Sequence, residues 1–311
     1  MLDPRIALML WIARRSGRVF RPDVSVAALR KTYAETNARF GLPDEGGVRS
    51  TDHTIATLDG TIRARLYRPQ DVPGPLPLLV FFHGGGFCIG DVASYDHLAH
   101  FFAREGRLAV ASIEYRLAPE FPFPHGHEDA FAALRWAQRN AGTFGADPTR
   151  IAVGGDSAGG ALAASLSAHA ESRGLARPAY QLLIYPSVDR NHDFPSARRY
   201  TKNLMLTPEV MAWFTARFLP GGAGTNDPLL ALLQVPHPER LPPTYLLAAQ
   251  YDPLVDEGNA YADRLRDAGV PVVYDLRRTL PHGFVNIAGP IPEARRALRD
   301  AIIATGEALR A

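Results

Sequence analysis

Short apolar runs alternate with helical segments through most of the chain. Between several of these runs, apolar residues recur at helical spacing, and a last helix begins at residue 292. Continuous apolar strands that alternate with helices are typical of a mainly parallel sheet covered by helices on both faces. The predicted strands cover residues 77–82, 108–115, 150–155, 180–186, 244–250 and 270–276. The predicted helices between them cover about 94–105, 128–140, 158–173 and 258–268.

Three stretches depart from this alternation. Residues 51–69 alternate apolar and polar positions around an Asp-Gly pair, which predicts a two-stranded antiparallel start. Residues 24–40 have apolar positions at helical spacing, so the N-terminal region is predicted to be helical. Residues 189–224 lie between two predicted strands, and Thr207 and Pro208 fit the cap and first turn of a helix. We expect this insertion to form a lid over the substrate pocket, at the carboxyl ends of the strands.

The composition is that of a soluble globular enzyme. Of the 311 residues, 46% are hydrophobic and 21% are charged, and a net charge of +2 without a basic block argues against nucleic-acid binding. Cys88 is the only cysteine, which excludes an intramolecular disulfide and a cysteine metal site. Apolar residues 6–13 lack the flanks of a signal peptide, and a membrane span needs about 20 residues. We expect a cytoplasmic protein with no membrane span, metal or cofactor.

A serine stands in a glycine cluster at the end of a predicted strand. Residues Gly155, Asp156, Ser157, Ala158 and Gly159 fit the pattern G-x-S-x-G. A serine nucleophile must project from a strained bend, and the two outer glycines allow the close packing that such a bend needs. A phosphate-binding turn is disfavoured, because neither G-x-G-x-x-G in register nor G-K-S/T is present. The motif alone leaves a structural glycine-rich turn open.

A second glycine cluster directly follows the predicted strand at 77–82. Consecutive glycines expose backbone N–H groups, and two of these, with the N–H of Ala158, could hold the negative oxygen of a tetrahedral intermediate. The alternative is a flexible loop whose histidine makes structural hydrogen bonds. The residues of this loop are His83, Gly84, Gly85 and Gly86.

Two further polar residues follow predicted strands in the last third of the chain. Enzymes that carry a serine on a strand-to-helix turn place the acid and then the histidine after it in the chain. His282 is the histidine after Ser157 that follows a strand, which makes it the expected base, whereas His83 precedes the serine. Asp252 lies at a strand end and is the expected acid, while Asp256 is expected to cap the next helix together with the adjacent glutamate.

These motifs together resemble the hormone-sensitive lipase-like esterases, bacterial family IV of the α/β-hydrolases. The resemblance runs from about Gly60 to Phe284 and implies an α/β fold with an eight-stranded, mostly parallel sheet, an antiparallel start and a helical cap. It also implies that Gly85 and Gly86 are oxyanion donors, with Ala158 as the third. The motifs are HGGGF at 83–87, YRLAPE at 115–120, DPTRIAVGGDSAGG at 147–160, YDPLVDEG at 251–258 and HGF at 282–284. The expected cap covers 1–47 and 189–224, and the expected core covers 48–188 and 225–311.

The resemblance implies a serine carboxylesterase that hydrolyses short- to medium-chain acyl esters through an acyl-enzyme. Its partner would be a small-molecule ester, and homodimers formed through the last strand and an adjacent helix are frequent in the family. An amidase or deacetylase would use the same triad and stays open, whereas the presence of His282 disfavours a homologue that only binds ligands. Residues that could line an acyl pocket or form the core of the cap are Phe87, Met205, Leu206, Met211, Trp213 and Phe214.

Overall fold

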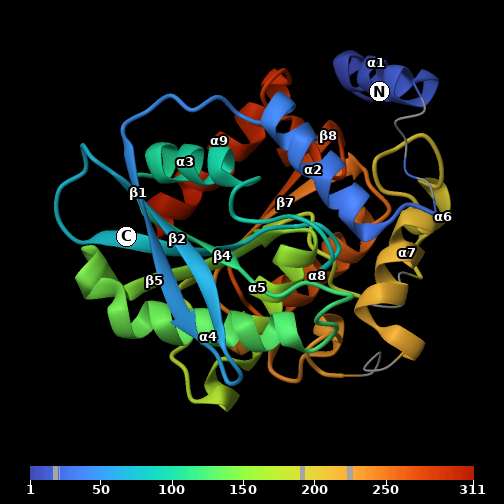
Figure 1. The fold of residues 1–311 in the computed structure, drawn as a ribbon. Helices are drawn as coiled ribbons and strands as arrows, with labels where there is room; N and C mark the ends of the chain where they lie inside the picture. Colours follow the sequence, from blue (N-terminus) through green and yellow to red (C-terminus); the bar gives the residue numbers. More distant parts are fainter. Residues whose placement is uncertain (17–19, 21, 190–192, 223–226) are drawn as a thin grey trace.

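An eight-stranded sheet, in the residues that the structure describes, forms the centre of the molecule (Figure 1). The computed structural model describes residues 1–16, 20, 22–189, 193–222 and 227–311, so 190–192 and 223–224 of the expected cap lie outside the described residues. The strands are β1 (Val48–Ala56), β2 (Thr61–Pro69), β3 (Leu76–Phe82), β4 (Ala109–Glu114), β5 (Ala146–Asp156), β6 (Tyr180–Ile184), β7 (Thr244–Tyr251) and β8 (Val272–Pro281). Their order is β1-β2-β4-β3-β5-β6-β7-β8.

The sheet is parallel except around β2. This strand pairs antiparallel with β1 on one side and with β4 on the other, while every later pair is parallel. The predicted hairpin and the predicted mainly parallel, eight-stranded sheet with an antiparallel start are thereby confirmed. Because the parallel strands run the same way, the loops that follow β3, β5, β7 and β8 meet at one edge.

Helices cover both faces of the sheet (Figure 1). One layer contains α3 and α9, and the opposite layer contains α4, α5 and α8. Alternate residues of β3 point to opposite layers: Leu78 and Val80 pack with one, and Leu79 and Phe81 with the other. The helices are α1 (Pro4–Arg15), α2 (Val26–Phe40), α3 (Asp96–Gly106), α4 (His125–Asn140), α5 (Ala158–His169), α6 (Pro195–Arg199), α7 (Pro208–Phe218), α8 (Val255–Asp267) and α9 (Pro292–Ala308).

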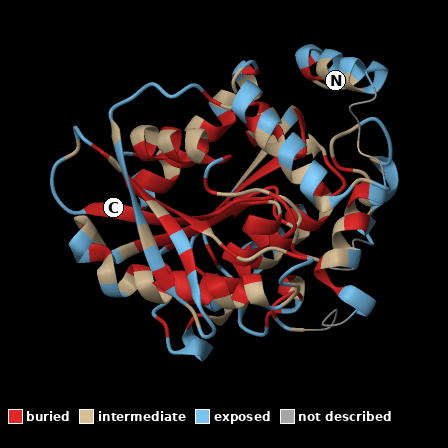
Figure 2. Ribbon diagram, in the orientation of Figure 1, coloured by how far each residue is buried: buried red, intermediate tan, exposed pale blue. Residues whose placement is uncertain are grey.

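Burial is concentrated in the sheet and in the helix faces that pack on it (Figure 2). Strand β3 is buried at every position, whereas α1 lies at the rim of the molecule and exposes most of its residues. Among the described helices, each one is too short or too polar to cross a lipid bilayer.

The N-terminal helices and the insertion after β6 come together at one side of the molecule (Figure 1). The ring of Phe20 meets the ring of Trp213 on α7 edge to face, with 5.9 Å between the centroids. Thr207 caps α7 as predicted, because its hydroxyl accepts a hydrogen bond from the Val210 N–H at 3.4 Å. Two segments far apart in the sequence, joined here by residues 193 positions apart, therefore form one helical layer.

Helix α8 begins three residues before its predicted start at residue 258. The two acidic residues expected to cap it, Asp256 and Glu257, bond to other elements. Asp256 lies within the first turn and accepts a hydrogen bond from the Ser196 N–H on α6. Glu257 is fully buried and accepts from the Val188 N–H at 2.9 Å. The two carboxylates thus tie the insertion after β6 to the core instead of capping their own helix.

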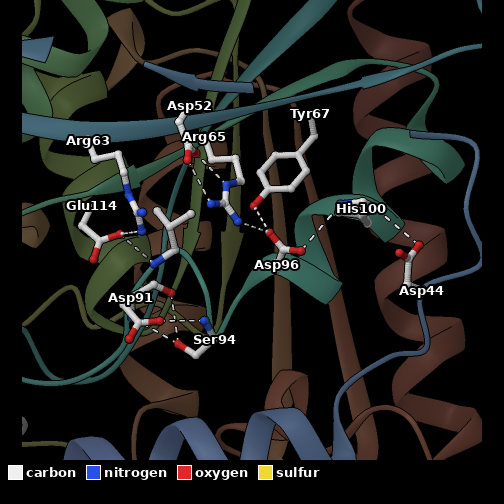
Figure 3. A network of polar contacts seen from close by, with 11 residues as sticks. Asp44, Asp52, Arg63, Arg65, Tyr67, Asp91, Ser94, Asp96, His100 and Glu114 are labelled. Atoms are coloured by element: carbon white, nitrogen blue, oxygen red, sulfur yellow. Dashed lines mark hydrogen bonds and ion pairs between the residues drawn. The ribbon is translucent and has the colours of Figure 1, made fainter. Parts of the chain in front are cut away.

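A polar network fastens the N-terminal hairpin to the start of α3 (Figure 3). The carboxylate of Asp96 accepts from the Tyr67 hydroxyl at 2.6 Å and from the Arg65 guanidinium at 2.9 Å. Arg65 also donates to Asp52 on β1 at 2.7 Å. Burial and the neighbouring Asp96 raise the pKa of Tyr67, so its hydroxyl stays protonated and remains a donor.

We expect Leu79→Ala to lower the free energy of unfolding by about 2–5 kcal/mol, because this fully buried residue of β3 would leave a cavity. The same substitution at Leu58, which is 90% exposed in the hairpin turn, should change it by less than about 0.5 kcal/mol. Urea unfolding of the two variants measures both values. Equal effects at the two positions would contradict the burial pattern.

Candidate active site

Ser157 lies on a sharp bend between β5 and α5. Its φ of 55° is in the left-handed region, which a side chain adopts only under strain, and its N–H donates to the Ile184 carbonyl at 2.9 Å. A methyl group at Gly159 would come within 2.6 Å of the His83 carbonyl oxygen, and one at Gly155 within 2.5 Å of the Phe82 carbonyl oxygen. The two glycines therefore let the bend approach the end of β3.

The side chains of Ser157, His282 and Asp252 form a continuous hydrogen-bonded chain. The Ser157 Oγ lies 2.9 Å from Nε2 of His282, and Nδ1 of the same ring lies 2.7 Å from Oδ2 of Asp252. An ionised carboxylate can only accept, so Nδ1 carries the proton and Nε2 is left as the acceptor for the serine hydroxyl. This arrangement can take the proton from Ser157 when its oxygen attacks an electrophile.

Neighbouring parallel strands bring the histidine and the carboxylate together. Asp252 directly follows β7, and His282 directly follows β8. Asp252 is fully buried, and its second oxygen accepts from the Leu254 N–H at 2.8 Å. The ring of Tyr185 lies 4.5 Å from that of His282, centroid to centroid. The carboxylate is thus fixed from two sides, and the imidazole is fixed by the carboxylate and an aromatic ring.

His83 makes structural contacts in the glycine loop after β3. Its Nδ1 lies 2.8 Å from the Gly84 carbonyl oxygen, and its ring stacks on Tyr115 with 4.4 Å between the centroids. The Tyr115 hydroxyl also donates to the His83 carbonyl at 2.7 Å. Burial lowers the pKa of His83, which keeps the ring neutral. The residue orders the loop and lies outside the Ser157 chain.

The expected oxyanion donors lie beside the serine. Gly85, Gly86 and Ala158 line the same cavity as Ser157. In the part of the chain that the structure describes, no hydrogen bond uses the N–H of these three residues. The Gly85 carbonyl accepts from two loop N–H groups at 3.0 Å each, and the φ of 114° at this position favours glycine. Backbone donors are therefore available where an acyl oxygen would lie.

The cavity in front of Ser157 has a volume of about 260 Å³ and lies between core and cap elements. Trp213 is not among its lining residues. The Trp213 ring instead packs between Phe20 and Phe214, with the guanidinium of Arg217 at 3.5 Å from its centroid, so it belongs to the cap interior. The other expected pocket residues line the cavity: Phe87, Met205, Leu206, Met211 and Phe214.

Helix α2 contributes a wall of the cavity that the sequence analysis did not assign. Leu29, Thr32, Tyr33 and Thr36 lie there, and their spacing puts them on one face of the helix. That spacing was readable in the sequence, but nothing local indicated which element the face would meet. Asn286, after β8, lines the cavity as well.

Asp156 is a buried carboxylate that neighbours the serine but points elsewhere. It accepts hydrogen bonds from the Gly84 N–H at 2.7 Å, the Tyr95 hydroxyl at 3.1 Å and the Tyr185 hydroxyl at 3.3 Å. Burial raises the pKa of Asp156 to about 6, although the hydrogen bonds act in the opposite direction. The carboxylate links the bend of β5 to the glycine loop after β3.

Comparison with known proteins identifies the family. A family model described as alpha/beta hydrolase fold matches residues 79–286, which include the serine bend and all three members of the hydrogen-bonded chain. The chain belongs to the α/β-hydrolase fold family. The resemblance of this α/β hydrolase to the hormone-sensitive lipase-like esterases is confirmed. Within the described ranges, no group of three or more His, Cys, Asp or Glu side chains is arranged to hold a metal ion.

Several similar proteins are esterases that match this chain over most of their own length. Carboxylesterase NlhH of Mycobacterium tuberculosis is 38% identical over 93% of this chain and 90% of its own. Ethyl acetate hydrolase of Pseudomonas putida is 35% identical over 96% of both chains. The solved structure of ester-hydrolase EH1AB1, from the metagenome of Lake Arreo, is 36% identical, covers 99% of both chains and superposes with a TM-score of 0.95.

The raised pKa of Asp156 predicts a pH-dependent loss of stability. Its pKa rises from an ordinary 3.8 to about 6 on folding, so the folded state holds this proton more tightly than the unfolded state. The free energy of unfolding of wild type, minus that of Asp156→Asn, should therefore fall as the pH rises from about 4 to about 6, by about 2 kcal/mol. Urea titrations across this range measure it. A flat or rising difference would contradict the burial argument.

Proposed function

We propose that this α/β hydrolase cleaves small carboxylic esters with Ser157 as the nucleophile, His282 as the general base and Asp252 as the residue that orients the base. The class of reaction follows from the family: the chain is a carboxylic ester hydrolase, as its relatives are. The observation that carries the assignment of roles is the unbroken chain from Ser157 Oγ through His282 to Asp252, at 2.9 Å and 2.7 Å.

The proposed reaction begins with acyl transfer. Ser157 Oγ attacks the ester carbonyl carbon while its proton passes to Nε2 of His282. The carbonyl oxygen becomes an oxyanion, which the N–H groups of Gly85, Gly86 and Ala158 stabilise, each by on the order of 3 kcal/mol. The bond to the alcohol oxygen then breaks, and the imidazolium gives that oxygen its proton.

Hydrolysis of the acyl-enzyme completes the cycle. Water enters in place of the alcohol, His282 takes one of its protons, and the resulting oxygen attacks the acyl carbon. The second tetrahedral intermediate collapses to release the carboxylic acid, and the proton returns from His282 to Ser157.

The expected cap segments, 1–47 and 189–224, support a preference for short- to medium-chain acyl groups. Side chains from both segments line a cavity of about 260 Å³. Apolar residues predominate there, including Met205, Met211 and Phe214, so an alkyl chain of limited length suits the space. Amide hydrolysis would use the same residues, and no observation favours it over ester hydrolysis.

Two expectations about the whole protein stay predictions. One is a homodimer formed through β8, the strand at the edge of the described sheet, and an adjacent helix. The other is a cytoplasmic location without nucleic-acid partners.

Removal of the nucleophile tests the proposed roles. Ser157→Ala should lower the kcat for a p-nitrophenyl acyl ester by about 10⁶-fold, because no other group can form the acyl-enzyme. An organophosphonate should label wild type at Ser157 and leave the variant unlabelled; the related EH1AB1 is known in complex with a bipyridine phosphonate derivative. Circular dichroism checks that the variant is folded. Wild-type turnover by folded Ser157→Ala would exclude Ser157 as the nucleophile.

The size of the cavity predicts the dependence on acyl length. The kcat/KM of p-nitrophenyl esters from acetyl to palmitoyl should be highest among the short and medium chains and fall at the long end, since a long chain exceeds the enclosed space. A parallel series with p-nitroanilides compares ester with amide turnover. A maximum at palmitoyl would overturn the proposed preference.

A further inference from the structure

A buried row of hydroxyl and carboxylate groups connects the cap helix α2 with the glycine loop. The Tyr33 hydroxyl on α2 lies 2.7 Å from the Tyr95 hydroxyl. Tyr95 donates to Asp156 at 3.1 Å, and the other oxygen of Asp156 accepts from the Gly84 N–H at 2.7 Å. This row, Tyr33–Tyr95–Asp156–Gly84, reaches from the cap to the residue just before the expected oxyanion donors.

We infer that Tyr33 is a positioning residue for the oxyanion hole: its hydroxyl orders the Tyr95–Asp156 pair that holds Gly84 in place. This inference rests on the proposed function, in which Gly85 and Gly86 stabilise the oxyanion. Helix α2 would then position the oxyanion loop in addition to lining the cavity.

The direction of the hydrogen bonds along this row follows from the number of hydroxyl protons that the two tyrosines carry. An ionised Asp156 only accepts, so the single hydroxyl proton of Tyr95 goes to it. The bond between the two tyrosines then requires the proton of Tyr33, which is shared with Asn286 Oδ1 as a second acceptor at 3.2 Å. Burial, followed by the charge of Asp156, raises the pKa of Tyr33 and of Tyr95, so both hydroxyls keep their protons. The Tyr95 hydroxyl therefore accepts from the Tyr33 hydroxyl at 2.7 Å and from the Gly84 N–H at 3.2 Å, and loss of the Tyr33 hydroxyl removes the shorter of these two bonds.

Gly84 is held on both of its peptide planes. Asp156 accepts from the Gly84 N–H, and His83 Nδ1 lies 2.8 Å from the Gly84 carbonyl oxygen. That carbonyl shares a peptide plane with the N–H of Gly85, so fixing one direction fixes the other. A glycine has no side chain to restrict it, and the loop depends on these outside contacts for its geometry.

The middle of the row is anchored independently of the cap. Tyr95 directly precedes α3, and Figure 3 shows the turn before it and the first residue after it held by polar contacts. The Ser94 N–H donates to Asp91 at 2.6 Å, and Asp96 accepts from Arg65 at 2.9 Å. The backbone of Tyr95 is therefore fixed by the core, while its hydroxyl contacts Gly84 and Asp156 in the core and Tyr33 on the cap helix.

Tyr33 is placed to couple substrate binding to this row. Its side chain lines the cavity, and its hydroxyl also donates to Oδ1 of Asn286 at 3.2 Å. A substrate that contacts the ring of Tyr33 thus touches the residue whose hydroxyl orders the oxyanion loop. The expected consequence is an effect on the transition state, where the oxyanion exists, and little effect on ground-state binding.

The variant Tyr33→Phe tests this, because it keeps the ring and removes the hydroxyl. Its kcat for p-nitrophenyl butyrate should fall by about 10-fold while KM stays within about 2-fold of wild type, since a misdirected donor acts only in the transition state. An alkyl boronic acid forms a tetrahedral adduct with the serine. It should bind to Tyr33→Phe about 10-fold more weakly than to wild type. Rates are expressed per site labelled by phosphonate, so unfolded protein does not count.

Two further variants separate positioning from general loosening. In a Tyr95→Phe background, adding Tyr33→Phe should lower kcat by less than a further factor of about 2, because the row is already broken. Tyr245→Phe removes a comparable bond, from a buried tyrosine to Asp275 at 2.7 Å, and should leave kcat unchanged.

Three results would overturn the inference: a kcat of Tyr33→Phe within about 2-fold of wild type, unchanged boronate affinity, or additive effects of the two substitutions. Each of these leaves the proposed function standing, because the Ser157→Ala experiment tests the catalytic roles separately.

Discussion

The close approach of the β5–α5 bend to the end of β3 is the constraint on which the site depends. Gly159 lies against the carbonyl groups of Phe82 and His83, at a separation that leaves no room for a side chain. That contact puts Ser157, the N–H of Ala158 and the glycine loop within one small volume. The strain of a positive φ at Ser157 is held by the strands on either side, which are fully buried in the sheet.

A buried carboxylate joins the two loops that this contact brings together. Asp156 costs free energy to bury, and three hydrogen bonds from Gly84, Tyr95 and Tyr185 offset part of that cost. The same carboxylate is connected through Tyr95 to α2. Core and cap are thus linked by polar contacts as well as by the apolar cavity wall, and the glycine loop takes its shape from both.

Much of the core could be predicted because its strands and its candidate site residues follow from patterns within the sequence itself. Continuous apolar runs marked the strands, and the chain order of serine, acid and histidine singled out Asp252 and His282. The cap was less predictable. Trp213 and Phe214 are adjacent on α7 and equally apolar, yet Phe214 faces the cavity while Trp213 packs against Phe20. Which face of a helix meets a cavity depends on partners distant in the sequence.

The sequence by itself determined the strands, the glycines of the bend and the three residues of the hydrogen-bonded chain, since these follow from periodicity, steric need and order along the chain. The tertiary structure alone decided that α2 lines the cavity and that Tyr33 meets Tyr95, 62 residues away, at 2.7 Å. Glu257 likewise accepts a hydrogen bond from the Val188 N–H across the fold. Such contacts join elements whose separation in space is set by packing, and no local pattern encodes that separation.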